Sequence, residues 1–566
     1  MSIIQKHKKK LVQIFKKEGL ELPIGSIEIP KRKEHGDLAV PCFIFAKDMK
    51  KPPVQIAQEL VDKIDTGKSF EKAECAGPYM NFFIDKNAMA EDLLKSINKD
   101  KSDAFRKKRP KRPRNVMVEF CSPNTNKPLH LGHLRNMLLG ESVSTLLENS
   151  GDEVVRSCLV NDRGIHICKS MVAYDLWGEG TTPKQEEKKG DHLVGDFYVK
   201  YSQYQDEELD ERAKSMLQKW EDGDRKTLDL WKKMNSWVMK GFEETYEKVG
   251  IKFDKYYYES ELYDKGKDTI MKAYDQGKFL MKDGAVVAQL EEYGLPDKVL
   301  VRSDGTTIYM TQDIFLATKK IEDYNLDASI YVVGSEQELH FKQLFRILEI
   351  LGYKQAKKCY HLSYGMVNLP DGKMKSREGT VVDADDLIAD VKSMAEEEIR
   401  KRDDSLPQKE LETRAKDIAM AGLKFYLLKH DPSKDMTYDP KESISFDGET
   451  GPYVQYTAVR INSIMEKSES GLKRDVDISR LEAPEHDLVS KLAQYQDVLD
   501  SATEKMRPNL IANYLIELSQ EFNSYYHNTK IVGTGMERER IYLINAVRIV
   551  LESGMSLLGI VIPDKM

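Results

Sequence analysis

Apolar residues recur along this chain at two spacings, one typical of helices and one typical of strands. Two groups of apolar residues near the N-terminus have helical spacing. The first is Leu11, Ile14 and Phe15, and the second is Ile56, Leu60 and Ile64. Two β-rich stretches, residues 39–45 and 79–84, lie next to Gly and Pro. The first hundred residues therefore predict a small α+β domain.

A strand, a turn, a helix and a second strand follow one another between residues 116 and 160. Residues 116–120 are a short β-rich run, residues 134–147 repeat apolar positions at helical spacing, and residues 153–160 are a second apolar strand. This order within so short a stretch predicts a βαβ unit and hence a parallel sheet.

The pattern changes again in the rest of the chain. Residues 177–230 are rich in Lys, Glu, Asp and Gln and predict a charged helical insertion. Strand-like runs return at residues 300–301, 307–310, 329–333 and 361–367. From residue 384 onward the chain predicts helices, with two apolar faces at Ile511, Tyr514, Leu515, Leu518 and Phe522, and at Leu543, Ala546, Val547, Val550 and Leu551. The order predicts an α/β fold in which a Rossmann-like parallel-sheet domain lies between a small α+β domain and an all-helical C-terminal domain.

Length and composition favour a soluble globular protein of several domains. The chain has 566 residues, of which 40% are hydrophobic and 32% are charged. No apolar run approaches the roughly 18 residues that a membrane span needs. The first residues lack the apolar core and the cleavage site of a secretory signal. We therefore expect no membrane partner.

The six cysteines are isolated from one another, with no C-x-x-C pair. So sparse a set predicts neither a disulfide scaffold nor a structural zinc site, and it fits a reducing, cytoplasmic compartment. They are Cys42, Cys75, Cys121, Cys158, Cys168 and Cys359.

Charge is unevenly distributed along the chain. The net charge is −7, yet residues 1–114 hold 26 Lys and Arg against 16 Asp and Glu. Eight of the fourteen residues from Lys101 to Arg114 are basic. Such a run can contact a polyanion, or it can be a solvated linker in which Pro110 and Pro113 favour extended chain. In either case it predicts a domain boundary near residue 110.

The first motif with chemical potential is His130-Leu-Gly-His133, at the predicted strand-to-helix turn. Helix N–H groups and the helix dipole face a ligand there, and Gly132 lets a ligand approach the backbone. Two imidazoles at this position can donate to phosphate oxygens. Their spacing also suits a metal, but no nearby carboxylate completes a ligand set, and the four-residue pattern alone arises often by chance.

The second motif is the glycine-bounded loop Gly372-Lys-Met-Lys-Ser-Arg-Glu-Gly379. Its cations can clamp phosphate, although the pattern of a P-loop is absent. Taken alone, the loop is more typical of a solvated surface turn.

Together, a His-x-Gly-His turn and a late Lys-Met-x-Ser loop resemble those of the class I aminoacyl-tRNA synthetases. The stretch EFCSPNTNKPLHLGHLRN (residues 119–136) resembles the arginyl-tRNA synthetase family within that class. So do YMTQD (309–313), YVVGSEQELHF (331–341) and GPYVQY (451–456), and residues 510–566 resemble the family's helical anticodon-binding domain. The resemblance covers essentially the whole chain and is weakest in residues 177–230.

The resemblance implies a two-step ligase reaction. L-Arginine attacks the α-phosphate of ATP, which gives arginyl-adenylate and pyrophosphate, and the arginyl group then moves to the 3′-terminal ribose of tRNA(Arg), first onto its 2′-OH in this class. No enzyme nucleophile is required, so catalysis rests on positioning and charge stabilisation. Mg²⁺ is expected on ATP, without a dedicated protein cage.

The resemblance also assigns residues to roles. The implied catalytic residues are His130, His133, Lys127 and Lys373. The implied ATP-binding residues are Gly132, His130, His133, Met366, Val367, Lys373, Met374, Lys375 and Ser376. The implied arginine-binding residues are Glu119, Asn124, Tyr309, Asp313 and Gln337.

Guanidinium is a planar cation, so a selective site needs fixed carboxylates and preferably an aromatic face. Glu119 and Asp313 can supply the carboxylates and Tyr309 the ring, while Asn124 and Gln337 would hold the α-amino end. Each residue also has an ordinary structural explanation: Glu119 can cap a strand, Asp313 can cap a helix and Tyr309 can lie in the core.

One departure from the class pattern concerns the late loop. The class sequence is Lys-Met-Ser-Lys-Ser, whereas this chain has Lys373-Met-Lys-Ser-Arg377, with its second lysine out of register. In the family, the lysine that corresponds to Lys127 is the usual proposed substitute, and Lys375 can share the task.

Contacts with tRNA follow from the same resemblance. The implied tRNA-binding residues are Tyr453, Tyr456, Arg460, Met566, Asn81 and Phe82. Aromatic platforms and cations are what unstacked bases need, although Tyr453 and Tyr456 can equally be helix-face core. The family is mostly monomeric, and it commonly requires tRNA before it activates arginine.

Four regions are predicted. Residues 1–110 form an additional tRNA-binding domain, residues 111–383 the Rossmann-like catalytic domain with its insertion at 177–230, residues 384–440 a helical connection and residues 441–566 the anticodon-binding domain.

Three competing hypotheses remain open at this stage. A small-molecule nucleotidyltransferase shares the two motifs but needs no helical C-terminal or basic N-terminal domain. A non-catalytic RNA-binding paralogue would be expected to lose His130, His133 or Lys373. A different amino-acid specificity would not require both Glu119 and Asp313.

Overall fold

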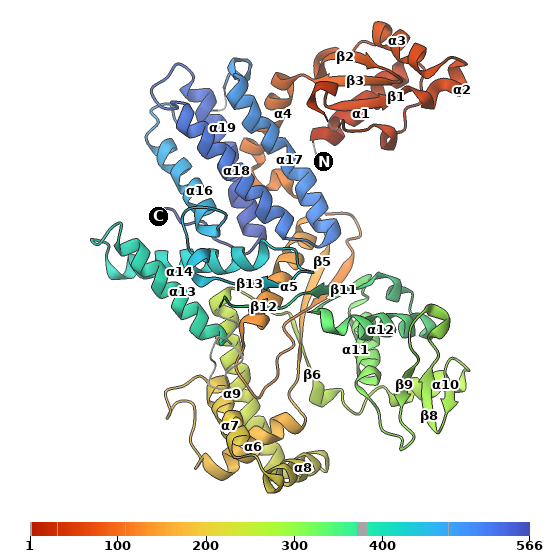
Figure 1. The fold of residues 1–566 in the computed structure, drawn as a ribbon, viewed down its shortest axis with the longest axis vertical. Helices are drawn as coiled ribbons and strands as arrows, with labels where there is room; N and C mark the ends of the chain where they lie inside the picture. Colours follow the sequence, from red (N-terminus) through yellow and green to blue (C-terminus); the bar gives the residue numbers. More distant parts are fainter. Residues whose placement is uncertain (1–2, 31, 108, 371–381, 474) are drawn as a thin grey trace.

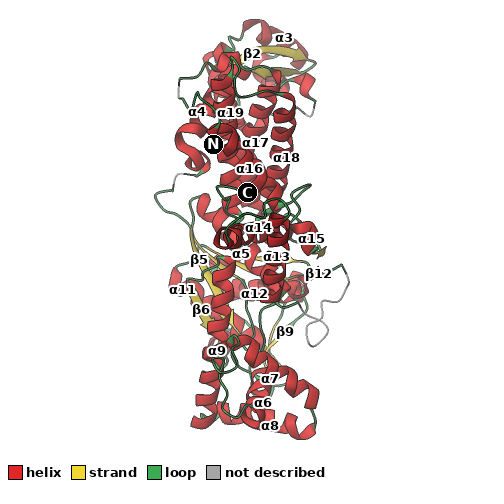
Figure 2. Cartoon of the chain, turned by 90° about the vertical axis from the view of Figure 1, so that its left-hand side faces the viewer, coloured by secondary structure: helices red, strands yellow, loops and turns green. Residues whose placement is uncertain are grey.

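The computed structural model describes residues 3–30, 32–107, 109–370, 382–473 and 475–566. The molecule is elongated, with the N-terminal domain at one end, a group of helices from residues 165–249 at the other, and a parallel sheet between them (Figures 1 and 2).

The N-terminal domain is a three-stranded sheet of order β1-β3-β2 with helices packed against it. Its strands are β1 (Leu38–Pro41), β2 (Phe70–Ala76) and β3 (Tyr79–Ile84), and its helices are α1 (Ile3–Lys17), α2 (Ala46–Met49) and α3 (Pro53–Lys63). The predicted helical residues of α1 are confirmed, as are Ile56 and Leu60 of α3, whereas Ile64 lies in extended chain just beyond the end of α3. Strand β3 occupies the predicted residues 79–84. The predicted strand at 39–45 is wrong in its second half, because Cys42–Phe45 turns into a 3-10 helix after Pro41.

The central sheet has five parallel strands in the order β11-β10-β4-β5-β6. The strands are β4 (Asn115–Glu119), β5 (Glu153–Val160), β6 (Lys255–Tyr258), β10 (Ala328–Gly334) and β11 (Cys359–Tyr364). Helix α5 (Leu131–Asn149) connects β4 to β5, which confirms the predicted βαβ unit. Helices α11 (Tyr309–Tyr324) and α12 (Glu338–Leu351) flank β10 in sequence.

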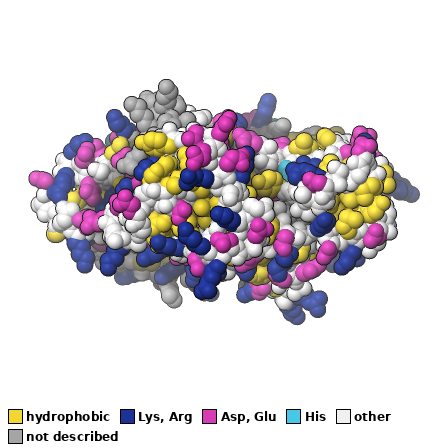
Figure 3. Space-filling model, turned by 90° about the horizontal axis from the view of Figure 1, so that it is seen from below, with side chains coloured by type: hydrophobic (Ala, Val, Ile, Leu, Met, Phe, Trp, Pro, Cys, Tyr) yellow, Lys and Arg dark blue, Asp and Glu magenta, His cyan; other side chains and the backbone are white. Residues whose placement is uncertain are grey.

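Four helices follow β5, namely α6 (Ile165–Trp177), α7 (Gly190–Tyr204), α8 (Glu207–Glu221) and α9 (Arg225–Val249). The predicted charged insertion at residues 177–230 is helical in α7, α8 and the start of α9, whereas residues 178–189 contain no helix. Figure 3 views this end of the molecule and shows basic and acidic side chains interspersed over it. A small antiparallel sheet of β7 (Leu280–Lys282), β8 (Ala285–Ala288) and β9 (Lys298–Val301) lies with α10 (Lys267–Asp275) farther along the chain.

Helices dominate the chain after residue 384, with one short pair formed by β12 (Val367–Asn368) and β13 (Met436–Thr437). The helices are α13 (Ala384–Arg400), α14 (Gln408–Leu428), α15 (Pro440–Ser443), α16 (Gly451–Glu466), α17 (Ala483–Lys505), α18 (Asn509–Asn528) and α19 (Glu537–Leu557). Every residue of the two predicted apolar faces is buried in α18 and α19.

The boundary near residue 110 does not separate two independent bodies. Helix α4 (Lys86–Asp100) packs against α17 and α19 of the C-terminal bundle rather than only on its own sheet. Asn98 donates to the carbonyl oxygen of Tyr542 at 3.2 Å, and Asn545 donates to Asn98 at 2.6 Å. The N-terminal domain is therefore joined to the C-terminal helices.

Within the described residues, no helix is both long and apolar enough to cross a membrane.

Candidate active site

The carboxyl ends of the parallel strands meet at one edge of the central sheet, which is where α/β folds bind their ligands. Strand β4 ends at Glu119, β6 at Tyr258 and β10 at Gly334. Most of the residues predicted for arginine and ATP follow one of these strand ends or the start of α5 or α11.

The turn that leaves β4 is strained. Cys121 and Ser122 have φ values of 76° and 45°, in the left-handed region that non-glycine residues rarely adopt. Asn136 of α5 holds this turn, because its side-chain oxygen accepts from the Cys121 N–H at 2.5 Å and its amide donates to the Val332 carbonyl at 2.8 Å. The strain is therefore maintained by contacts with both α5 and β10.

His130 and His133 cap the first turn of α5 reciprocally. The Gly132 N–H donates to Nδ1 of His130, and the His130 N–H donates to Nδ1 of His133, each at 3.1 Å. Because both Nδ1 atoms accept, each neutral ring carries its proton on Nε2. The pair thus offers two Nε2–H donors at a helix N-terminus, where phosphate binds favourably.

Burial keeps these imidazoles neutral near pH 7. Burial, with a smaller contribution from the Lys127 ammonium, lowers the pKa of His130 to about 4. Burial also holds the pKa of His133 well below its usual value, with contributions from His130 and Lys127. Positive charge beside the pair must therefore come from Lys127 rather than from the rings.

Gly132 has a local reason to be glycine. A Cβ at this position would lie 3.0 Å from Cε1 of His130, so a larger residue would press on the capping ring. From the sequence, Gly132 is explained by the access that it gives a ligand to the backbone. The structure adds a second reason, because the absence of a side chain leaves room for the His130 ring.

The His130 turn is paired with the segment just beyond residue 381. The Leu131 N–H donates to the Val382 carbonyl at 2.9 Å, and the Ala384 N–H donates to the Leu129 carbonyl at 3.0 Å. His130 and Asp383 form an isolated antiparallel bridge between these contacts. The backbone of residues 382–384 therefore forms one wall of the turn.

Four of the predicted ATP-binding residues, Lys373, Met374, Lys375 and Ser376, lie outside the described residues. The strand that precedes them is described. Met366 exposes 54% of its surface, and its carbonyl accepts from Arg135 at 3.1 Å, while Val367 pairs with Met436 in the short sheet. Arg135, which is 2% exposed, also donates to the carbonyls of Gly365 and Lys434 and so ties this strand to α5.

Both carboxylates predicted for arginine already have a partner on one oxygen. Oε2 of Glu119 forms an ion pair with Lys320, and these side chains are 7% and 1% exposed. Oδ2 of Asp313 lies 2.6 Å from Nε2 of His340. The Lys320 ammonium therefore balances the charge of Glu119, so the predicted arginine-binding residues carry less net negative charge than two lone carboxylates would.

Sequence reasoning missed Lys320 and His340. Lys320 lies seven residues after Asp313, hence on the same side of α11, and its ammonium is 5.2 Å from the centre of the Tyr331 ring. The sequence pattern predicts no helix over these residues, so nothing in it marked Lys320 as a buried cation that requires a partner.

Glu259, which follows β6, is a third acidic residue at this edge. Burial raises its pKa to about 7, with Arg163 opposing the shift and Asp162 and Asp313 adding to it. Asp313, a predicted arginine-binding residue, is thus one of the charges that act on Glu259. No motif in the sequence pointed to it.

The remaining predicted arginine-binding residues are exposed. Tyr309 begins α11 and is 75% exposed, so it does not lie in the core. Asn124 bridges to Asn161 after β5, and Gln337 ends a short 3-10 helix after β10. The predicted strand at residues 307–310 is wrong, because Tyr309 and Met310 belong to α11.

Comparison with known proteins decides the family. A family model described as "tRNA synthetases class I (R), catalytic domain" matches residues 94–439. Models of the arginyl tRNA synthetase N-terminal domain and of the DALR anticodon binding domain match residues 2–84 and 454–566. The chain belongs to the arginyl-tRNA synthetase family.

Individual relatives agree with this assignment. An arginine–tRNA ligase of Treponema denticola is 44% identical over 553 residues, which cover 94% of this chain and 93% of that protein. One of Parabacteroides distasonis is 41% identical and covers 97% of each chain. The structure of Thermus thermophilus arginyl-tRNA synthetase superposes with a TM-score of 0.79 at 25% identity, over the full length of both chains.

In this arginyl-tRNA synthetase family member, a groove of about 710 Å³ in the C-terminal bundle brings together residues far apart in sequence. Its lining includes Tyr456, Arg460 and Met566, as well as Tyr526, which the sequence did not single out. The Arg460 guanidinium lies 4.7 Å from the centre of the Tyr456 ring and 5.7 Å from that of Tyr526. Tyr453 is half-buried, and its hydroxyl accepts from Asn523 at 3.0 Å.

The two residues predicted to contact tRNA in the N-terminal domain are buried. Phe82 is fully buried and packs edge-on against Phe15 and Phe70, and Asn81 is 5% exposed. Neither side chain therefore presents much surface to RNA, although the two point to opposite faces of β3 and only Phe82 packs against Phe15 and Phe70. Phe43, on the same domain, is 51% exposed.

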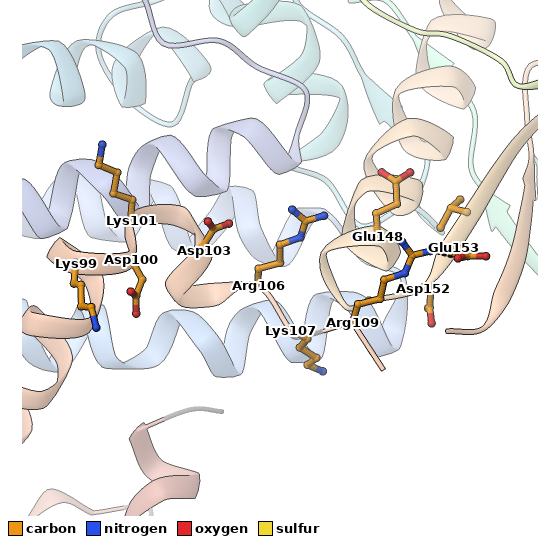
Figure 4. Close-up of a pocket in the computed structure, with 12 residues that line it drawn as sticks. Lys99, Asp100, Lys101, Asp103, Arg106, Lys107, Arg109, Glu148, Asp152 and Glu153 are labelled. Atoms are coloured by element: carbon orange, nitrogen blue, oxygen red, sulfur yellow. Dashed lines mark hydrogen bonds and ion pairs between the residues drawn. The ribbon is translucent and has the colours of Figure 1, made fainter. Parts of the chain in front are cut away.

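The basic run from Lys101 to Arg114 is partly neutralised within the protein. It borders a cleft of about 1260 Å³ between α4 and the start of β5, where Arg109 forms an ion pair with Glu153 (Figure 4). Arg114 pairs with Asp152, and Lys107 lies 3.0 Å from Asp500. Lys111 and Arg112 are exposed.

Two observations bear on metals and cysteines. In the part of the chain that the structure describes, one group of residues, Asp191, His192 and Asp385, has the spacing to surround a cation, and the Lys189 ammonium already lies against two of its carboxylates. The six cysteines are unpaired, and all of them are among the described residues.

Proposed function

We propose that this protein is an arginine–tRNA ligase, which uses ATP to form arginyl-adenylate from L-arginine and then transfers the arginyl group to tRNA(Arg). The observation that supports this most directly is the capped pair of neutral imidazoles at the start of α5, beside a strand end that carries Glu119. The named activity of the relatives over nearly the full chain supports the same reaction.

In the first step, an oxygen of the arginine carboxylate bonds to the α-phosphorus of ATP, and the bond from that phosphorus to the bridging oxygen breaks. Pyrophosphate leaves. His130 and His133 would donate Nε2–H bonds to phosphate oxygens while Lys127 and Lys373 balance the developing negative charge. Because both rings stay neutral, they would donate these bonds without transferring a proton.

In the second step, the 2′-OH of the terminal ribose attacks the adenylate carbonyl and AMP leaves. The proton of that hydroxyl passes to a phosphate oxygen of the departing AMP or to solvent, and the protein supplies no nucleophile. Placement of the two substrates would supply most of the rate enhancement, because fixed reactants avoid the entropy cost of a bimolecular encounter.

The arginine site would use the carboxylate oxygens that do not contact Lys320 or His340. Those oxygens are Oε1 of Glu119 and Oδ1 of Asp313. Tyr309, exposed at the start of α11, would cover the guanidinium, and Asn124 and Gln337 would hold the α-amino end. A planar cation bound by two separate carboxylates is distinguished from the compact ammonium of lysine.

The C-terminal groove would receive anticodon bases, with Tyr456, Tyr526 and Arg460 as stacking surfaces and Met566 as its edge.

We divide the chain into the four predicted regions, which are residues 1–110, 111–383, 384–440 and 441–566. ATP would arrive as its Mg²⁺ complex, and the protein would act as a monomer in the cytoplasm.

The first step can be tested by arginine-dependent exchange of pyrophosphate into ATP, with and without tRNA. We expect exchange that requires arginine and tRNA, and that lysine does not support. Exchange that is independent of arginine would contradict the proposal. Equal exchange without tRNA would contradict only the expected tRNA requirement, and unimpaired exchange in Lys127→Ala would remove Lys127 from the catalytic set.

A further inference from the structure

A buried cluster of charged residues joins the insertion helices to the start of α13. Its centre is the Asp385 carboxylate, which is 11% exposed. This carboxylate accepts from Lys189 and from the Thr245 hydroxyl at 3.0 Å on one oxygen, and from Lys248 at 2.6 Å on the other. Nε2 of His192 lies 3.4 Å away.

The partners come from two different helices of the insertion region. Lys189 and His192 lie at the start of α7, whereas Thr245 and Lys248 lie in the last turns of α9. The two helices approach closely here, because a Cβ at Gly190 would lie 2.1 Å from the Trp237 carbonyl oxygen. One side chain of α13 therefore receives contacts from two closely packed helices.

The contacts within the cluster favour the charged forms of Asp385 and His192. Burial acts to raise the pKa of Asp385, but its contacts with His192, Lys189 and Lys248 hold that pKa far below the usual range. Burial acts to lower the pKa of His192, but Asp385, Asp383 and Asp191 raise it overall. A buried ion that lost these partners would be costly, so the arrangement is strongly specified.

Asp385 directly follows residues 382–384, whose backbone pairs with the His130 turn. Asp383 caps α13 through the N–H groups of Asp385 and Asp386, and it forms the bridge to His130. Contacts therefore run from α7 and α9 through Asp385 to residues 382–384, and from there to the turn that carries the two imidazoles.

We propose that α7 and α9 position the phosphate-binding turn through Asp385. Lys189, His192, Thr245 and Lys248 hold that carboxylate, and with it residues 382–384, whose backbone forms one wall of the His130 turn. These are positioning residues, because none of them is placed against a substrate. The inference rests on the proposed function, and it gives the predicted insertion at 177–230 a task in ATP use.

The test compares Asp385→Asn with Asp386→Asn, in the full chain with tRNA present. Asp386 is the matched control, because it lies in the same first turn of α13 but is exposed. Each change removes one negative charge from the N-terminus of α13. Any loss of favourable interaction with the helix dipole is therefore the same in the two variants. The readouts are kcat and the KM values for ATP and for arginine in pyrophosphate exchange, together with the unfolding midpoint.

We expect Asp385→Asn to lower kcat/KM for ATP by about tenfold or more, since a small misplacement of catalytic groups has effects of this size. The KM for arginine should change less than twofold by comparison, and Asp386→Asn should match the wild type. Asp385→Glu should recover part of the loss, because it restores the charge. If Asp385→Asn does not fold, Lys248→Met, at a half-exposed position, should show the same ATP-selective loss to a smaller degree.

Equal losses for ATP and arginine, or an unchanged ATP parameter in a folded variant, would overturn the inference. Failure of the wild type to charge arginine would instead overturn the proposed function. In that case the affinity for a non-hydrolysable ATP analogue, measured by calorimetry for the wild type and both Asn variants, still decides the inference. A weaker affinity in Asp385→Asn alone supports it, and equal affinities contradict it.

Discussion

At the level of single residues, the His130–His133 pair combines a structural and a chemical role in the same two rings. Nδ1 of each ring accepts a backbone bond, and Nε2–H is left for the ligand. These roles can be separated by substitution, because an Asn side chain reaches the position of Nδ1 but not that of Nε2.

For His130→Asn we expect the pyrophosphate-exchange rate to fall by about a hundredfold, as for the loss of one preorganised donor. The unfolding free energy should change by less than about 1 kcal/mol, because Asn is a favourable N-cap residue. Exchange kinetics and urea unfolding measure the two effects. A rate within threefold of the wild type would show that the Nε2–H group is not used.

The same residue predicts a pH effect on stability. The pKa of His130 falls from 6.5 in the unfolded chain to about 4 in the folded protein, so the unfolded state binds the extra proton first. Stability from this residue is complete above pH 6.5 and is lost as pH falls toward 4, by up to about 3 kcal/mol. Urea unfolding at pH 7 and pH 5 should show a larger loss in the wild type than in His130→Asn. Equal losses would contradict the assigned shift.

Lys320 shows what the sequence could not reveal. The carboxylate of Glu119 was a predicted arginine ligand, but its partner lies 201 residues away, and only the pairing of β4 with β10 and the placement of α11 bring them together. The type of each residue was visible in the sequence, whereas the contact was not.

For Lys320→Met we expect a loss of about 3–5 kcal/mol in unfolding free energy, because Glu119 is left buried without its partner. The double variant Glu119→Gln/Lys320→Met should recover most of this stability and still bind arginine poorly. Thermal unfolding and the KM for arginine measure the two properties. A single variant as stable as the wild type would show that the pair is not buried in solution.

At the level of elements, the βαβ unit was predictable because its signals are local. Strand β5 and helix α5 each carry their own periodicity, and the turn between β4 and α5 carries its own motif. The stretch at residues 307–310 misled the prediction, since β-branched Thr307 and Ile308 suggest a strand while Met310 and Ile314 already belong to the buried face of α11.

The fit of α5 on β4 depends on Gly140. A Cβ there would lie 2.3 Å from Cγ of Phe120, which is fully buried. Gly140→Ala should therefore destabilise the protein by about 1–3 kcal/mol, despite the better helix propensity of Ala. Gly25→Ala, where the new Cβ meets nothing within 4 Å, is the control in thermal unfolding. Equal midpoints for the two variants would mean that α5 can shift without cost.

At the level of the whole molecule, the C-terminal groove contains both residues that the sequence predicted and one that it did not. It named Tyr456, Arg460 and Met566 through a family resemblance, and the structure places all three on one groove. It missed Tyr526, because a single aromatic residue on a helix has no local signal that distinguishes a surface platform from core.

The net charge of −7 conceals a basic N-terminal part, and the structure divides its basic run into paired and unpaired charges. Arg109 and Arg114 are used in ion pairs, whereas Lys111 and Arg112 are exposed. We expect Lys111→Gln/Arg112→Gln to weaken tRNA binding and to reduce the slope of log affinity against log salt by about one for each lost phosphate contact.

Arg114→Gln is the control for this prediction, because its charge is already balanced by Asp152. Filter binding at several salt concentrations measures both the affinity and the slope. If the double variant keeps the affinity and slope of the wild type, residues 101–114 are a linker and not a contact with tRNA.

The most direct test of the proposed function is the attachment of each labelled amino acid, in turn, to total tRNA in the presence of ATP and Mg²⁺. The proposed function predicts that arginine is attached and that the other amino acids, lysine included, are not. Attachment of a different amino acid, or of none, would contradict it.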